Sequence, residues 1–350
     1  MASATILAWV LSSEVALLAG IFLIFLGHGA WLWLERRRSR PLLARGRRAL
    51  ITALEEGIPP VEREWLGTLA SSLQVRMFAD VAPSLSGMQR QKLTALAHDI
   101  HLTTKAKTLC ESSFWWRRLE GARLFTLLKA GETVVPLLFL DYHPVVRAQA
   151  AEWAADHPRA ANIDSLLSLL SDMNPLCCFT AQDSLLRMGS VIVEPLARYL
   201  FLHTGQQIEA ALQVAAGLAD LDFLAPALAL CQDESPQVRT LAATLVGAVG
   251  GIVGVDALTI LLSDDCPEVR AAAAQALGKL HHWPAAARLA SLLRDRAWIV
   301  RQEAGLALRA LGAPGQLFLR RLCTDSDPYA ADMARQILDL PVEGEVVGSL

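Results

Sequence analysis

A seven-residue pattern that recurs about every 31 residues constrains the fold of this chain more than any other feature of its sequence. The pattern is Asp-x-x-Pro-x-Val-Arg, and its four clear copies are DYHPVVR, DESPQVR, DDCPEVR and DRAWIVR, which begin at Asp141, Asp233, Asp264 and Asp295, with Trp298 in the proline position of the last. Partial copies begin at Asp172 and Asp325, a degenerate one is expected near Gln206, and a weaker one begins near Phe114. A fixed period of this length predicts an array of stacked supersecondary units.

Each consensus residue suits a turn that leads into a helix. Aspartate in the turn accepts hydrogen bonds from free backbone N–H groups and favours the positive end of the next helix. Proline suits the first helical turn, where an N–H would have no partner, and the Val and downstream Ala and Leu positions form a buried stripe. The Arg is predicted to pair with the Asp of its own or of the adjacent copy. Stacking then builds an Asp–Arg ladder of Asp141, Arg147, Asp233, Arg239, Asp264, Arg270, Asp295 and Arg301.

Apolar segments such as IDSLLSLL, VEPLARYLFL and DALTILL lie between the helices that carry the pattern. The repeating unit is therefore predicted to be a helix–turn–helix hairpin. Leu241–Val255 is apolar enough to suggest a membrane span, but it is too short to cross a bilayer. Because Gly250-Gly251 falls at the expected turn, we assign this run to the hairpins as well.

The pattern resembles the HEAT repeats of bacterial proteins, in particular the short form called PBS-lyase HEAT-like repeats. The resemblance covers about residues 112–340, and it implies an all-α solenoid in which antiparallel helix pairs stack into a right-handed superhelix. It also implies that the second helix of each pair lines the concave surface, the usual partner groove. The polar residues expected to face outward there are Gln149, Glu152, Asp183, Gln275 and Glu303.

The ladder arginine is missing from two consecutive copies, where Cys178 and Glu209 take its place. One hypothesis is that the solenoid bends or opens at residues 172–217 and that a partner docks there, with Glu209 on the partner surface. The alternative is neutral drift in the middle of the array. In that case, restoring arginine at both positions leaves partner binding unchanged.

A single transmembrane helix is predicted ahead of the array, over Val15–Leu34. These residues carry no charge, and at about 1.5 Å per residue they span about 30 Å, the thickness of a hydrocarbon core. Tryptophans lie near the end of the segment, and an arginine cluster follows at once, so the N-terminus is expected outside and the array in the cytoplasm. The residues expected to contact lipid headgroups are Arg36, Arg37, Arg38 and Arg40.

These features divide the chain into five parts. They are an N-terminal segment with the transmembrane helix (1–35), a basic juxtamembrane collar (36–48), an irregular helical region (49–111), the solenoid (112–340) and a tail (341–350). Outside the seven collar arginines, Glu14 and Glu35, the chain has 25 basic and 33 acidic side chains. This acidic body argues against a nucleic-acid-binding groove, which requires Lys and Arg on one face.

No set of residues points to a catalytic centre. His98 and His101 have a spacing that zinc ligands use, but such a site needs four ligands. Cys177 and Cys178 are adjacent, but Cys178 occupies the ladder position inside a helix, which favours burial over redox chemistry. The six cysteines include no CxxC pair and are expected to be reduced. We therefore expect no metal, no cofactor and no enzymatic activity.

The sequence thus predicts a single-pass protein of a bacterial inner membrane that acts as a scaffold or adaptor. Its expected partners are proteins at the membrane, such as an envelope or polysaccharide-synthesis complex, together with the bilayer itself. An alternative follows from the resemblance, because some HEAT-like proteins are bilin lyases or isomerases. On that interpretation, the chain is an enzyme that acts on a bound small molecule.

Overall fold

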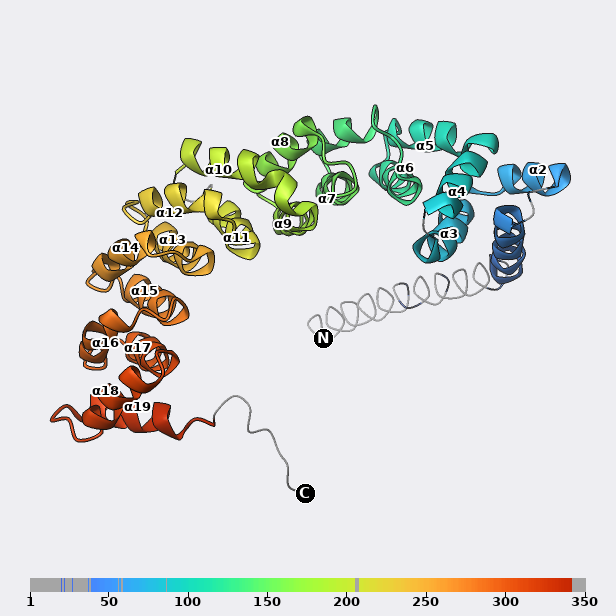
Figure 1. The fold of residues 1–350 in the computed structure, drawn as a ribbon. Helices are drawn as coiled ribbons and strands as arrows, with labels where there is room; N and C mark the ends of the chain where they lie inside the picture. Colours follow the sequence, from blue (N-terminus) through green and yellow to red (C-terminus); the bar gives the residue numbers. More distant parts are fainter. Residues whose placement is uncertain are drawn as a thin grey trace, which may run out of the picture. The chain divides into compact units, whose positions relative to one another are not determined.

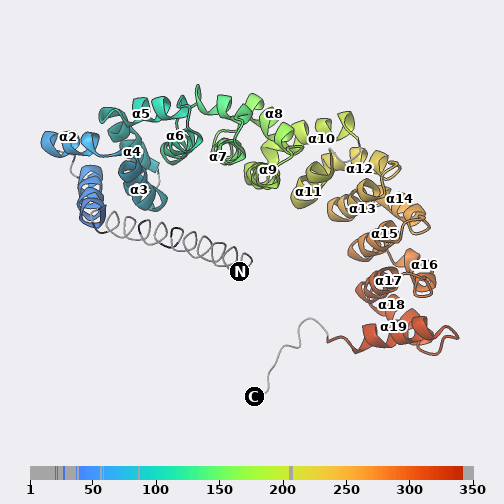
Figure 2. The same cartoon turned by 180° about the vertical axis from the view of Figure 1, so that it is seen from behind.

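The computed structural model describes residues 20, 22, 27, 37, 39–55, 57, 59–85, 87–204 and 208–341. All regular structure in these residues is helical, and they contain no strand. The predicted all-α class is therefore confirmed. The chain separates into two compact units, Met1–Val135 and Pro136–Leu350, which Figures 1 and 2 show from opposite sides.

Unit 1 contains a helix over residues 39–55 followed by α2 (Pro60–Thr68), α3 (Ser71–Val81), η1 (Ala82–Ser84), α4 (Gly87–Asp99), α5 (Leu102–Cys110) and α6 (Trp115–Leu128). Its core consists of fully or almost fully buried side chains from each of these α-helices, including Leu50, Leu66, Phe78, Leu93 and Leu102. Long side chains join elements that are distant in sequence, because Lys92 Nζ donates to the Leu54 carbonyl oxygen at 3.0 Å. This unit holds the region predicted as irregular helices.

Unit 2 contains the repeat array as a series of α-helices and short 3-10 turns. In chain order the elements are η2 (Val135–Leu140), α7 (Pro144–Ala154), α8 (Ala160–Leu169), α9 (Pro175–Met188), η3 (Gly189–Ile192), α10 (Val193–Leu202), α11 (Glu209–Leu218), η5 (Leu221–Phe223), α12 (Leu224–Leu230), α13 (Pro236–Val249), α14 (Val253–Leu261), α15 (Pro267–Lys279), η6 (Trp283–Ala285), α16 (Ala286–Leu292), α17 (Trp298–Ala310), α18 (Ala313–Leu322) and α19 (Pro328–Asp339).

The odd-numbered helices start where the sequence pattern places them. Six of the seven begin at the proline position of their copy, and the exception is α11, which begins at Glu209 in the arginine position. The residue before each proline is extended, as the proline ring requires. The pattern aspartates accept the N–H of the residue two positions later at 2.8–3.0 Å. The turn and the helix start are therefore specified by short-range interactions.

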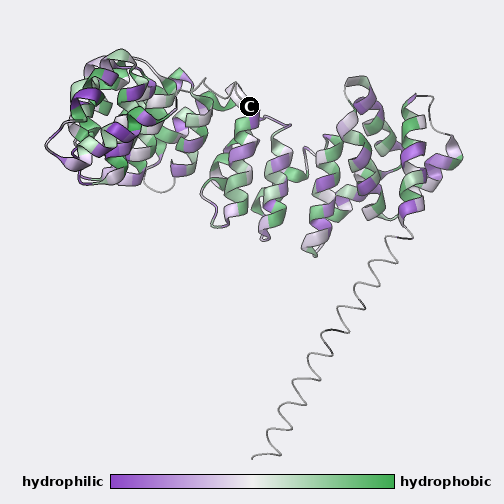
Figure 3. Ribbon diagram, turned by 90° about the horizontal axis from the view of Figure 1, so that it is seen from below, coloured by the Kyte–Doolittle hydropathy of each residue, from purple (hydrophilic) through white to green (hydrophobic). Residues whose placement is uncertain are grey.

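Unit 2 has two layers, because the odd-numbered helices α7 to α17 lie on one side and the even-numbered helices α8 to α16 on the other (Figures 1 and 2). The valine position of the pattern faces between the layers, and Val146, Cys177, Ile208, Val238 and Val269 are all fully buried there. Figure 3 shows hydrophobic and hydrophilic residues on the same helices, as expected for helices with one buried face.

Glycine allows α13, α15 and α17 to approach closely. A Cβ at Gly247 would lie 2.6 Å from the Ala276 Cβ, and one at Gly278 would lie 2.7 Å from the Ala307 Cα. At these two contacts, the space between neighbouring helices is too small for a side chain at the glycine position. The Gly250-Gly251 turn, with both residues at positive φ, separates α13 from α14 as predicted.

The predicted transmembrane segment, residues 15–34, lies outside the described residues except at positions 20, 22 and 27. Within the part of the chain that the structure describes, no helix combines the length and hydropathy needed to cross a bilayer. Of the arginines expected at the headgroups, Arg37 and Arg40 are described and exposed, whereas Arg36 and Arg38 lie outside the described residues.

Candidate interaction surface

Three arginines of the pattern form a bidentate pair with the aspartate of the following copy, 25 residues further along the chain. Arg147 donates from Nε and Nη2 to the Asp172 carboxylate at 2.7 and 2.8 Å. The pairs Arg239–Asp264 and Arg270–Asp295 repeat this geometry at 2.8–2.9 Å. In each case Nη1 also donates to the carbonyl oxygen of the arginine's own pattern aspartate, at 2.7–2.9 Å.

The ladder therefore uses both partners that the sequence left open. The guanidinium bonds the backbone of its own turn and the carboxylate of the next one, so each arginine ties two consecutive repeats together. Bidentate, charge-assisted pairs are among the stronger hydrogen bonds in proteins, and these side chains are largely buried, with 16–18% exposure for the arginines and 10% for the aspartates.

The pairing changes the acidity of the ladder carboxylates. Hydrogen bonds from Arg147 and Arg239 hold the pKa values of Asp172 and Asp264 below their usual range, and burial of the carboxylates offsets only part of this effect. At Asp295, burial acts to raise the pKa, but the hydrogen bonds from Arg270 and from the Ala297 N–H lower it by more. Asp172, Asp264 and Asp295 are therefore ionised at neutral pH.

The ladder changes at its C-terminal end, where the step between copies is one residue shorter. Arg301 keeps the bond to the Asp295 carbonyl oxygen at 2.8 Å, but its guanidinium lies over the Tyr329 ring, 5.2 Å from the centroid. Asp325 instead pairs with Arg294, whose Nε lies 3.1 Å from the carboxylate. The more exposed Arg294 thus replaces the pattern arginine.

An earlier copy of the turn lies in unit 1. Arg118 Nη1 donates to the carbonyl oxygens of Ser112 and Ser113 at 2.9 and 3.1 Å, the same two bonds that Arg239 and Arg270 make in their turns. Trp115 occupies the proline position of this copy. Arg118, Asp172 and Asp325 were not among the predicted ladder residues, although their spacing from neighbouring copies was the available signal.

The ladder is interrupted between the copies at Asp172 and Asp233. Cys178 occupies the arginine position, and its Sγ donates to the Leu170 carbonyl oxygen at 3.3 Å. The aspartate position 25 residues later holds His203, whose ring stacks on Tyr199 with centroids 4.0 Å apart. Within the described residues, no arginine pairs with Asp233. We call each Arg–Asp pair between consecutive copies a rung of the ladder. The interruption therefore removes both partners of one rung, of which only the loss of the arginine was predicted from the sequence.

Exposed apolar side chains gather beside this interruption. We call Tyr142, Met173, Leu176 and Phe179 the α9 patch; they are 71%, 99%, 47% and 67% exposed. Tyr142 and Met173 occupy the same turn position of neighbouring copies, which the Arg147–Asp172 pair joins. Leu176 and Phe179 are three residues apart in α9 and therefore share a side of that helix.

The residues predicted to form a polar partner surface lie on the odd-numbered helices but differ in exposure. Glu152, Asp183 and Gln275 are exposed, and Glu209 and Glu303 are partly exposed. Gln149 differs from the expectation, because it is buried and its side chain donates to Glu152 Oε2 at 2.9 Å. Because the Gln149 amide donates this hydrogen bond to a residue one helical turn away, its side chain can be buried without a water partner.

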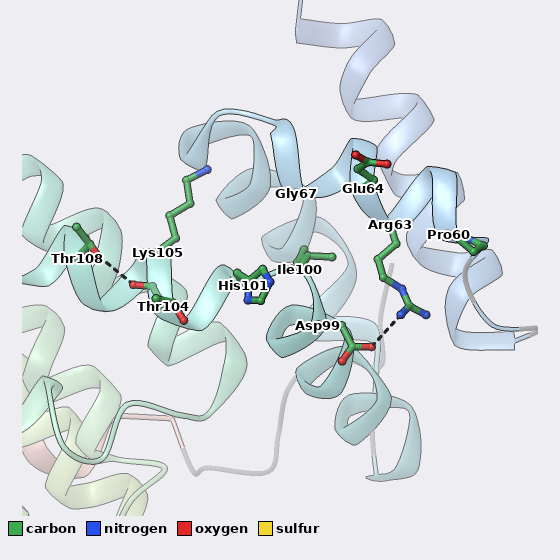
Figure 4. A pocket seen from close by; sticks show the side chains of 10 residues that line it. All are labelled: Pro60, Arg63, Glu64, Gly67, Asp99, Ile100, His101, Thr104, Lys105 and Thr108. Carbon is green, nitrogen blue, oxygen red and sulfur yellow. Dashed lines mark hydrogen bonds and ion pairs between the residues drawn. The ribbon is translucent and has the colours of Figure 1, made fainter.

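Unit 1 has an open cleft of about 650 Å³ between α2 and the α4–α5 junction, drawn in Figure 4. Arg63 and Asp99 form an ion pair across it at 3.7 Å. Lys105 also lines the cleft, but its Nζ donates to the Leu69 carbonyl oxygen and to Gln74 Oε1 at 2.9 and 3.0 Å. The charged groups of the cleft are thus largely satisfied by other protein groups.

The candidate metal and redox residues have ordinary structural surroundings. His98 and His101 are exposed, and no group of metal-binding side chains occurs among the described residues. Burial raises the pKa values of the Cys177 and Cys178 thiols. Burial also raises the pKa of Cys110 to about 12 and that of Cys231 to about 11. None of these four thiols has the lowered pKa of a reactive cysteine.

One known family matches the C-terminal part of the repeat array. The HEAT repeats family matches residues 255–339, and no curated protein matches the chain. Similar solved structures include an engineered protein, with 19% identity, a TM-score of 0.39 and coverage of 87% of this chain and 94% of that one. Another is the complex of CpcE and CpcF of phycocyanin lyase from Nostoc, with 16% identity, a TM-score of 0.32 and coverage of 68% and 93%.

A third is the structure of Kap95p with RanGDP, with 14% identity and a TM-score of 0.48. This match covers 83% of the present chain and 51% of Kap95p. The family match spans the copies that begin at Asp264, Asp295 and Asp325, and the same turns and helix pairs recur through unit 2. Residues 255–339 are therefore similar to the HEAT repeats family.

Proposed function

We propose that this protein is a membrane-anchored scaffold whose HEAT solenoid lies in the bacterial cytoplasm and binds a protein partner at the inner membrane. The partner is a membrane protein of envelope or polysaccharide synthesis that presents an apolar segment to the solenoid. The observation that carries the proposal is the α9 patch beside the interrupted ladder. Function on this proposal is binding, without catalysis.

The α9 patch has the composition of a protein-binding site. Tyr, Met and Phe are enriched at the centres of protein interfaces, and one of the four side chains, that of Met173, is 99% exposed. The fold does not require apolar residues at these positions. The turn position of Tyr142 and Met173 is held by Glu234 and Asp265 in later copies, so its apolar character belongs to this part of the array alone.

The interrupted rung adds a physical reason for docking at this place. Where a rung forms, as between Arg147 and Asp172, it holds two turns together and its charged groups pair inside the protein. Between α9 and α11 the described residues contain no such link, so the repeats there are free to adjust to a partner. This supports the hypothesis that a partner docks over residues 172–217.

The membrane anchor is proposed from the sequence of residues 15–48. An uncharged segment of bilayer length is followed by seven arginines, which favours insertion with the arginines on the cytoplasmic side. Unit 1, which contains these residues, has 17 basic and 11 acidic side chains. An excess of positive charge is compatible with an anionic membrane surface.

The test is affinity capture from gently solubilised native membranes. The full chain is compared with a chain that starts at Pro41, with a full chain carrying Met173→Glu and Phe179→Glu, and with a matched control carrying Ile260→Glu and Leu317→Glu. The control residues are 72% and 68% exposed apolar side chains of even-numbered helices. We expect the full chain and the control to retain one stoichiometric membrane protein and the patch variant to lose it.

The comparison separates the parts of the proposal. A partner that stays bound to the patch variant refutes docking at α9, and a partner lost equally from the control shows that the charges act nonspecifically. If the chain starting at Pro41 stays in the membrane pellet after an alkaline wash, residues 1–40 are not the anchor. If the full chain retains no protein but copurifies with a chromophore, the binding proposal fails and the bilin-lyase alternative gains support.

A further inference from the structure

A cluster of aromatic rings lies at the start of α6 in unit 1. We call Phe114, Trp115, Trp116 and Arg117 the α6 cluster. The rings of Phe114 and Trp116 stack with centroids 4.7 Å apart, and those of Trp115 and Trp116 meet edge to face at 6.1 Å. The Arg117 guanidinium lies 5.6 Å from the centre of the Phe114 ring. Phe114 and Trp116 are nevertheless about half exposed, at 49% and 51%.

The repeat fold does not require this concentration of aromatic residues. The same three positions read HPV, NPL, SPQ and CPE in the copies that begin at Asp141, Asp172, Asp233 and Asp264. The turn beneath the cluster is firmly held, because buried Arg118 donates to the carbonyl oxygens of Ser112 and Ser113. The rings are thus displayed on a rigid turn, which suits recognition of a surface.

The distribution of charged residues indicates what kind of surface the α6 cluster contacts. Unit 1 carries 17 basic and 11 acidic side chains, and seven of the basic ones are the collar arginines of residues 36–48, whereas unit 2 carries 15 basic and 24 acidic ones. Indole rings prefer the interfacial zone of a bilayer, and arginine is attracted to anionic headgroups in the same zone. Exposed aromatic rings with an adjacent arginine, in the unit that also carries the arginine collar, match the chemistry of an anionic lipid surface.

We infer that the α6 cluster is a second membrane contact, in which Phe114 and Trp116 insert among the headgroups of anionic lipids and Arg117 binds their phosphates. The inference rests on the proposed membrane anchor, because the anchor brings unit 1 to the bilayer. It adds a specific contact in the folded part of unit 1. The contact limits how unit 1 can turn relative to the membrane plane.

The experiment places a photoreactive benzophenone amino acid at position 116 of the full chain. The protein is reconstituted into vesicles of phosphatidylcholine, with or without phosphatidylglycerol, and is then irradiated. The matched control carries the probe at position 299, the equivalent position of the copy in α17, where Ile299 is 42% exposed. Melting temperatures of both labelled proteins verify that the substitutions leave the fold intact.

We expect position 116, but not position 299, to form a lipid adduct, with a higher yield when phosphatidylglycerol is present. Arg117→Gln should lower that yield roughly fivefold, the effect of one basic residue near an anionic surface. Equal lipid adducts at both positions, no lipid adduct at 116, or a protein adduct at 116 would each overturn the inference.

The same samples report the anchor separately. If the chain remains in the pellet after an alkaline wash but position 116 forms no lipid adduct, the anchor stands and the second contact is refuted. If the chain washes off and position 116 still forms an adduct in anionic vesicles, the anchor fails and the contact is supported. Loss of both signals refutes both ideas.

Discussion

At the scale of single residues, the ladder depends on the geometry of the arginine side chain. Its fork of donors reaches a carboxylate on one side and a backbone carbonyl on the other, as Arg239 does with Asp264 and Asp233. Lysine cannot reproduce this arrangement, since it has a single charged nitrogen and no planar fork. The requirement for arginine follows from the distance between turns, which the stacking of repeats fixes.

Replacing one carboxylate tests this role. We expect Asp264→Asn to lower the free energy of unfolding by about 2–4 kcal/mol, because Arg239 then lies largely buried without its counter-charge. Asparagine keeps the oxygen that accepts the Cys266 N–H, so the turn itself remains. Urea unfolding measures the change. Asp332→Asn is the control, because its pair with Arg335 is more than half exposed, and it should change stability by less than about 0.5 kcal/mol.

The same pairs predict how stability depends on pH. The pKa values of Asp172, Asp264 and Asp295 are lower in the folded chain than usual. Their stabilisation is therefore complete above the unfolded-state value of about 3.9 and is lost as pH falls through the folded values. The melting temperature should decrease on acidification below about pH 4, and the decrease should be smaller in Asp264→Asn. An identical slope in both proteins would contradict this assignment.

At the scale of elements, helix separation depends on small residues. A Cβ on Gly278 would lie 2.7 Å from the Ala307 Cα, a backbone atom that cannot rotate away. We expect Gly278→Ala to destabilise unit 2 by about 1–3 kcal/mol through overpacking, although alanine favours a helix. Gly67→Ala is the control, because its Cβ would have no neighbour closer than 3.7 Å. Thermal unfolding measures the stability of both variants, and an equal loss of stability in the two would refute the packing argument.

A second prediction at the scale of elements concerns the missing rung at positions 178 and 203. Each rung joins an arginine to the aspartate 25 residues later, so arginine at 178 needs aspartate at 203. We expect the double variant Cys178→Arg/His203→Asp to be more stable than the sum of its single variants by about 1 kcal/mol or more. A double-mutant cycle by urea unfolding measures this coupling, and additive effects would show that the rung does not form.

The same double variant bears on docking. If partner binding requires the repeats around α9 to adjust, capture should weaken when the rung is present. If the substitutions at these positions arose by drift alone, capture should be unchanged. Each single variant serves as the control, since neither residue alone completes a rung.

At the scale of the whole molecule, the stability of unit 2 depends on contacts between neighbouring repeats. Two rungs link the turns before α13, α15 and α17, and glycines allow these helices to approach closely. Among the residues that the structure describes, no rung links α9 to α11. We expect hydrogen exchange of backbone amides to be at least about tenfold slower in α13, α15 and α17 than in α9 and α11. Uniform protection along unit 2 would show that the rungs contribute little.

The sequence by itself determined the features that depend on short-range interactions. Asp–Pro turns and the buried valine position involve residues within one turn and one helix, so the 31-residue pattern predicted the all-α class and the helix starts of unit 2. Cys178 and Glu209 also identified the repeats in which the ladder arginine is missing. The anchor over residues 15–34 remains a prediction, because it lies outside the described residues except at three positions.

Only the tertiary structure decided which groups meet between repeats. The carboxylate bound by Arg147 belongs to a partial copy, and Asp325 pairs with Arg294 because a shorter step moves it away from Arg301. The burial of Gln149 and the exposure of Phe179 likewise depend on how adjacent helices pack. A local pattern fixes the conformation of each repeat, but pairing and exposure depend on distances between repeats, and these are set by the packing of many side chains at once.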